Sequence, residues 1–188
     1  TLKDARMDKV CIVGLGSIGG FVAHRLVEGG RPVSALARGA TLAAVRRHGL
    51  VLRDAKDPER GRAVSIAASD SAKELGPQDL VILSVKTTAL PAIPESIAPL
   101  LGPHTVVLSA MNGVPWWFFH GLGERWRGTR LEATDPTGAL AHTMPPERVV
   151  GCVVHMSASS PEPGVVLHAA GDRFIVGEPG GAATPRLD

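Results

Sequence analysis

Three glycines in the motif Gly14-x-Gly16-x-x-Gly19 have the spacing found where a strand turns into a dinucleotide-binding helix. With 22 glycines among 188 residues, the spacing alone is weakly specific, so its setting carries the argument. The first glycine permits a tight turn, the second lets the backbone approach a pyrophosphate, and the third lets helix and strand pack closely. The phosphates then lie on the helix N-terminus. A ligand-free glycine turn is the alternative. The predicted cofactor-binding segment comprises Gly14, Leu15, Gly16, Ser17, Ile18 and Gly19.

Arg38, 19 positions after Gly19, bears on which nicotinamide cofactor would fit. NAD sites usually have an acidic residue at this point that binds the ribose 2′-hydroxyl, whereas NADP sites have an arginine for the 2′-phosphate. No acid ends this strand, and a guanidinium matches a phosphate in charge and geometry. The sequence therefore favours NADP(H), with a surface arginine capping the strand as the alternative.

Two further polar side chains follow predicted strands. Lys86 comes directly after the apolar run 80–85, and Asn112 follows the run 105–110. Ligands of open parallel sheets bind at the carboxyl ends of the strands, so both residues are candidates to position a substrate and the nicotinamide. A solvated lysine at a helix start and an Asn-Gly turn explain the same pattern equally well.

The elements that position these residues alternate between strands and helices, which predicts an α/β fold with a Rossmann-type parallel sheet. Predicted strands span residues 10–13, 32–37, 50–53, 63–67, 80–85 and 105–110, and helical patterns span about 21–27, 41–48 and 89–101. The polar stretch 54–60 predicts a hairpin or an irregular connection. Three short strands, 149–156, 165–168 and 174–177, predict an antiparallel extension near the C-terminus.

Composition and charge exclude several classes of protein. The chain is 44% hydrophobic and 20% charged with a net charge of +2, so it is globular rather than disordered. Its basic residues are interleaved with acidic ones, which argues against a nucleic-acid partner. No run approaches the roughly 18 apolar residues of a membrane helix, and residues 1–6, before the candidate native start Met7, show no signal-peptide pattern.

Cysteine and histidine usage argues for a reduced, metal-free protein. Cys11 and Cys152 lie in apolar runs far apart in the chain, which predicts two buried thiols and a cytoplasmic setting. The seven histidines show no metal-ligand spacing, and no Ser/His/Asp arrangement can be singled out. The aromatic run 116–119 is expected in the core, or as a surface for a partner domain.

Taken together, these motifs resemble the ketopantoate reductases, also called 2-dehydropantoate 2-reductases. The similarity covers nearly the whole chain from Lys9 onward. It rests on GLGSIG (14–19), ARG (37–39), SVKT (84–87), MNGVPWW (111–117), PERVVGC (146–152), EPGVVLH (162–168) and RFIVGEP (173–179).

The resemblance implies an enzyme of pantothenate and coenzyme A biosynthesis that reduces ketopantoate, a small 2-oxo acid, to pantoate with NADPH. It places Arg38 at the 2′-phosphate, Lys86 near the nicotinamide and substrate, and Asn112 at both ligands. It leaves a homodimer open. Family members continue into a helical domain that carries the general-acid lysine.

We therefore expect residues 8–178 to form the NADP-binding domain and residues 179–188, which have linker composition, to lead toward a helical domain that is absent here. The chain alone is expected to be inactive. Two alternatives stay open, namely a stand-alone NADP(H)-binding module without turnover and a reductase of another 2-oxo acid.

Overall fold

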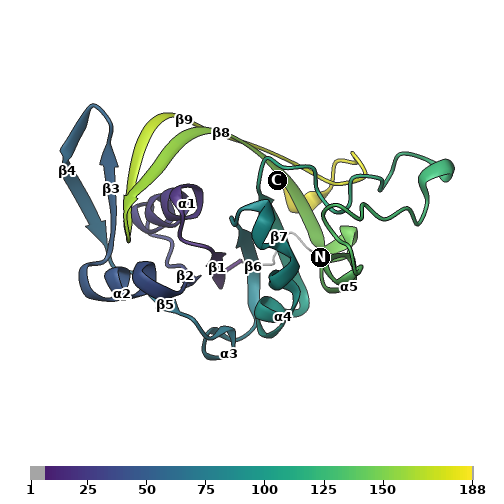
Figure 1. Ribbon diagram of the computed structural model, residues 1–188, viewed down its shortest axis with the longest axis horizontal. Coiled ribbons are helices and arrows are strands. Elements are labelled where there is room, and N and C mark those ends of the chain that lie inside the picture. Colours follow the sequence, from purple (N-terminus) through teal and green to yellow (C-terminus); the bar gives the residue numbers. More distant parts are fainter. Residues whose placement is uncertain (1–6, 188) are drawn as a thin grey trace.

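Nine strands form one sheet that curls around the helix α1, Ser17–Glu28 (Figure 1). The structure, a computed structural model, describes residues 7–187, so the targeting prediction made for residues 1–6 lies outside the described residues. The strand order is β4-β3-β9-β8-β7-β6-β1-β2-β5. Helix α1 contacts strands from both halves of the sheet, among them β1, β8, β9 and β3.

The predicted Rossmann-type parallel sheet is confirmed. Its central strands are apolar runs, as expected where helices or curled sheet cover both faces. The parallel strands of this part of the sheet are β1 (Val10–Val13), β2 (Ser34–Leu36), β6 (Gln78–Leu83) and β7 (Leu101–Ala110), with β5 (Ala67–Ser69) at the edge. Strand β1 lies between β2 and β6, both parallel to it.

The helices follow the predicted order, but one of them is broken. Helices α1 and α2 (Gly39–His48) match their patterns, and Gly49 ends α2 with a φ of +77° that favours glycine. The helical stretch predicted over 89–101, which the sequence shows to be punctuated by prolines, consists of three short helical elements between residues 87 and 100, because Pro91, Pro94 and Pro99 remove backbone donors. The short helical elements are η2 (Thr87–Ala92), α3 (Ala72–Leu75), α4 (Ile93–Ile97), α5 (Ala139–Thr143), η3 (Ala98–Leu100), η4 (Glu124–Trp126), η5 (Pro146–Arg148) and η6 (Pro185–Leu187).

A hairpin of β3 (Leu50–Asp54) and β4 (Asp57–Val64) forms one edge of the sheet. The prediction of a strand over 63–67 is wrong, because β4 occupies most of the polar stretch 54–60 and Ala67 already belongs to β5. Nearly every residue of β4 is exposed, so its polar side chains do not show the apolar alternation that predicts a strand.

The C-terminal extension consists of two long strands, β8 (Val149–Glu162) and β9 (Val165–Gly177), rather than the three predicted. The antiparallel pairing of β8 with β9 is confirmed. The pairing of β8 with β9 shifts its register near Gly171, which has a φ of +71°. This shift makes a β-bulge in β9 at the place where the sequence predicts a turn between two strands. Strand β8 also pairs parallel with β7, and β9 pairs parallel with β3, which closes the curl over α1 (Figure 1).

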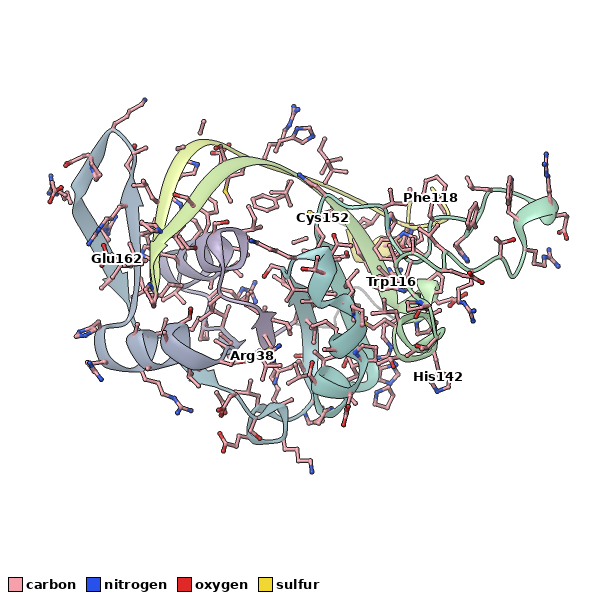
Figure 2. The ribbon with its side chains drawn as sticks, viewed as in Figure 1. Arg38, Trp116, Phe118, His142, Cys152 and Glu162 are labelled. Carbon is pink, nitrogen blue, oxygen red and sulfur yellow. The ribbon has the colours of Figure 1, made fainter. Side chains whose placement is uncertain are left out.

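The aromatic run is divided between core and surface. Trp116 is buried and its indole N–H donates to the Met144 carbonyl at 3.0 Å. Phe118 is 48% exposed (Figure 2), and Phe119 stacks on Trp126. The two cysteines, Cys11 and Cys152, are buried free thiols as predicted, and burial raises the pKa of each.

Candidate nucleotide-binding site

The turn from β1 into α1 requires glycine at its first motif position. Gly14 has a φ of +93°, and a Cβ there would lie 3.1 Å from the Ser84 carbonyl oxygen. Its backbone N–H donates to the Leu36 carbonyl at 3.0 Å, which fixes the turn to the end of β2. The turn into α1 thus lies at the carboxyl ends of three neighbouring strands, β2, β1 and β6.

The other two motif glycines have different surroundings. A Cβ on Gly19 would lie 2.0 Å from the Gly14 carbonyl oxygen and 2.1 Å from the Ser84 hydroxyl, so only glycine fits between helix and strand. A Cβ on Gly16 would meet no atom within 4 Å. The open side of Gly16 is therefore where another molecule can approach the backbone.

The N-terminus of α1 is free to bind an anion. Gly16 is its N-cap residue, no side chain among residues 7–187 caps the helix, and its first turn contains no acidic residue. The first amide N–H groups of a 12-residue helix are thus left without side-chain partners, and the helix dipole adds partial positive charge. This end suits a phosphate.

A cleft of about 690 Å³ lies directly beside this loop. Its walls come from the glycine loop, the end of β2, the start of α2, helix α4 and the turn between β8 and β9. The volume falls in the range of small-molecule sites. Among its lining residues the charged ones are Arg38, Asp70 and Glu162.

The structure places Arg38 in the same cleft as the glycine loop. Arg38 follows β2, is the N-cap residue of α2 and is exposed. Within residues 7–187 its guanidinium has no ion pair. Arg38 and the glycine loop thus line the same cleft, and the Arg38 guanidinium is available to bind an anion.

Two acidic residues also line the cleft, and sequence reasoning missed both. Asp70 follows β5, which pairs parallel with β2 so that Ser69 lies opposite Leu36. Glu162, at the far end of the β8–β9 hairpin (Figure 2), receives a hydrogen bond from Arg53 at 3.2 Å. Only the pairing of distant strands brings these carboxylates to the cleft, so no local signal could have found them.

Lys86 and Asn112 lie on adjoining segments but outside the residues that line this cleft. Lys86 is exposed at the start of η2, next to the cleft residue Val85. A Cβ on Gly113 would lie 2.7 Å from the Thr87 hydroxyl, so the chain after β7 passes against the chain after β6. These contacts bring the two segments together.

The side chain of Asn112 binds the backbone of β8. Its Nδ2 donates to the Val154 carbonyl at 2.9 Å, and its Oδ1 accepts from the Val154 N–H at 2.8 Å. One N–H and one lone pair of the amide are left for another partner. Asn112 therefore has a structural role beside any role at a ligand.

A larger cavity of about 2170 Å³ lies elsewhere, between α1 and the inner face of β6 and β7. Its lining contains none of the predicted site residues. Across residues 7–187, no group of three or more His, Cys, Asp or Glu side chains is arranged to hold a metal ion. In that same part of the chain, no helix has both the length and the apolar character needed to span a membrane.

A parallel sheet, a glycine turn at the start of α1 and a cleft at the carboxyl ends of its strands define an α/β domain of the Rossmann class. The sequence profile of the family ketopantoate reductase PanE/ApbA matches residues 10–116, more than half of the chain. The chain belongs to this family.

Individual relatives agree with this membership. A 2-dehydropantoate 2-reductase from Mesorhizobium japonicum is 44% identical over 180 residues, which cover 95% of this chain and 54% of the relative. A crystal structure from Ralstonia solanacearum MolK2, assigned as a ketopantoate reductase, has 44% identity and a TM-score of 0.90 over 97% of this chain and 56% of the other. The 2-dehydropantoate 2-reductase of Geobacter metallireducens has 27% identity and a TM-score of 0.76, over 95% of this chain and 52% of the other.

The chain spans about half the length of the curated relatives it matches. The family implies a nicotinamide cofactor. The residues present fit such a group, because the open side of Gly16, the uncapped helix and the cleft beside them offer room and positive charge for a pyrophosphate.

Proposed function

We propose that this chain is the NADPH-binding half of a 2-dehydropantoate 2-reductase, an oxidoreductase of pantothenate and coenzyme A biosynthesis. The observation that carries the proposal is one cleft that joins the open glycine loop to the unpaired Arg38 guanidinium. The loop and the start of α1 would hold the pyrophosphate, and Arg38 would bind the 2′-phosphate. The two buried thiols favour a cytoplasmic enzyme.

The reaction class follows from the family, and the residues of this chain take binding and orienting roles in it. When bound, the nicotinamide supplies a hydride to the 2-oxo carbon. The exposed Lys86 ammonium attracts the substrate carboxylate, and the free N–H of Asn112 is available to orient the substrate or the nicotinamide amide. The proton donor is expected in the part of the longer relatives that this chain does not span.

Titration of the chain with NADPH and NADH, followed by nucleotide fluorescence, tests the cofactor. We expect tighter binding of NADPH, because NADH lacks the phosphate that Arg38 would pair with. Arg38→Ala should weaken NADPH binding by about 1.5–3 kcal/mol, the range for a hydrogen bond to a charged group, and change NADH binding little.

Arg47→Ala is the matched control. Arg47 is exposed at the opposite end of the same helix and does not line the cleft, so its loss removes the same charge from α2 without touching the site. Equal affinities of the wild-type chain for NADPH and NADH would overturn the NADPH assignment, and so would equal effects of the two variants.

A further inference from the structure

Charged side chains of both signs line the cleft beside the glycine loop. A dinucleotide phosphate is a polyanion, yet the charged side chains on the walls are one arginine, Arg38, and two carboxylates, Asp70 and Glu162. A carboxylate near a phosphate is repulsive unless its charge is matched. How each carboxylate is placed and paired therefore decides how well the cleft accepts a phosphate.

Asp70 lies beside Arg38 because of strand pairing. Leu36 of β2 is opposite Ser69 of β5, and the Ala37 N–H donates to the Ser69 carbonyl at 2.9 Å. Asp70 thus lies one residue beyond the last paired position of β5, and Arg38 lies two residues beyond the last paired position of β2. Paired strands are about 4.8 Å apart.

Helix α2 is fixed to the same strand pair. The Arg46 guanidinium, in the last turn of α2, donates to the Ala68 carbonyl of β5 at 3.0 Å. The helix that begins after Arg38 is therefore hydrogen-bonded to the strand that ends before Asp70.

The two carboxylates differ in their partners. The Arg53 guanidinium is within 3.2 Å of Glu162, so that charge is matched. Asp70 is exposed, and within residues 7–187 its side chain has neither an ion pair nor a hydrogen bond. Among the described residues, Asp70 is therefore the carboxylate of the cleft whose charge is not matched, and it follows the strand that pairs with β2, the strand before Arg38.

We infer that Asp70 is a specificity-determining residue that narrows the difference between the affinities for NADPH and NADH. This inference rests on the proposed function. A 2′-phosphate at Arg38 meets the Asp70 carboxylate as a like charge. The 2′-hydroxyl of NADH carries no charge and is not repelled. Arg38 still favours NADPH, but less than it would beside a neutral residue.

The test compares Asp70→Asn with the matched variant Glu162→Gln, since each removes one negative charge from the cleft wall. Both are titrated with NADPH and NADH by nucleotide fluorescence, and thermal melting checks that each variant is folded. We expect Asp70→Asn to bind NADPH about threefold to tenfold more tightly, the scale of Coulomb repulsion across a solvated cleft, with NADH changed less than about twofold. Glu162→Gln should change both affinities less than about twofold, because Arg53 already matches that charge.

Ionic strength gives a second readout. The gain from Asp70→Asn should shrink in about 1 M NaCl, where the Debye length falls to about 3 Å. An unchanged NADPH affinity in Asp70→Asn, or a loss of NADH affinity that shows Asp70 binding the ribose hydroxyl, overturns the inference while leaving the proposed function intact. If the wild-type chain binds neither nucleotide, the proposed function itself fails.

Discussion

Two of the three motif glycines, Gly16 and Gly19, should separate into one that serves the ligand and one that serves the fold. The perturbation is the same single methyl group, introduced by Gly16→Ala or by Gly19→Ala. The methyl group of Gly16→Ala would enter open space at the edge of the cleft, whereas that of Gly19→Ala would overlap the Gly14 carbonyl and the Ser84 hydroxyl. The two variants add the same atom at two places, one at the N-cap of α1 and one inside the helix.

The expected magnitudes follow from these surroundings. Gly16 has extended φ and ψ values of −76° and −164°, which alanine adopts freely, so the cost is a poorer N-cap, about 1 kcal/mol. At Gly19 the nearest backbone atom, 2.0 Å away, must move. Such overpacking costs typically about 1–3 kcal/mol and more where backbone shifts, against a helix-propensity gain of about 1 kcal/mol.

Urea unfolding and NADPH titration, run on both variants, give the two readouts. We expect Gly16→Ala to lower the free energy of unfolding only by the roughly 1 kcal/mol of the poorer N-cap, and to bind NADPH at least about tenfold more weakly, a loss of about 1.4 kcal/mol. We expect Gly19→Ala to unfold at a clearly lower urea concentration. Tight NADPH binding by Gly16→Ala, or a wild-type midpoint for Gly19→Ala, would refute this assignment of the two glycines.

Two further predictions concern the chain outside the loop. The Glu178 carboxylate is 7% exposed and binds Arg186, which holds its pKa below the ordinary value, so its stabilisation is present at neutral pH and lost as the pH falls through that lowered pKa. Glu178→Gln should therefore lower the free energy of unfolding by about 1.5–3 kcal/mol at pH 7, and its urea midpoint should converge with that of wild type as the pH falls through the lowered pKa of Glu178; a constant difference would contradict the ion pair. Asn112→Asp places an oxygen against the Val154 carbonyl and should cost about 1–3 kcal/mol in urea unfolding, with an unchanged midpoint as the contrary result.

The sequence was most informative where the interactions are local. The order of strand, glycine turn, helix and second strand through Gly49 follows from apolar runs and glycines within a few residues of each other. The position of Arg38 beside the glycine loop follows from the same βαβ unit, because parallel neighbours place their carboxyl ends together. The three prolines of the segment 89–101 are also a local signal, and they account for its division into short helical elements.

The parts that could not be predicted depend on pairing between distant segments. Strand β4 has no apolar alternation and exists as a strand because β3 pairs with it. Strand β9 is interrupted in sequence by the bulge at Gly171, so its two halves look like separate strands. Asp70 is 32 residues from Arg38 in sequence, and only the β2–β5 register makes them neighbours.

These distant pairings also determine how rigidly the candidate site is held. A Cβ on Gly20 of α1 would lie 2.6 Å from Val166 of β9, so that strand packs directly on the helix one residue beyond the glycine motif. Farther along α1, the His24 ring nitrogen Nε2 is 2.8 Å from the Arg62 carbonyl of β4, which makes this nitrogen the donor.

The helix whose N-terminus faces the cleft is thus held by strands that contribute no residue to the predicted motif. A binding element that is already ordered loses less conformational freedom when its ligand arrives. If α1 binds the nucleotide as proposed, the curled extension of β3, β4, β8 and β9 preorganises the site, since these strands pack on the helix whose N-terminus faces the cleft. Loosening that extension should weaken nucleotide binding even though most of it lies outside the cleft.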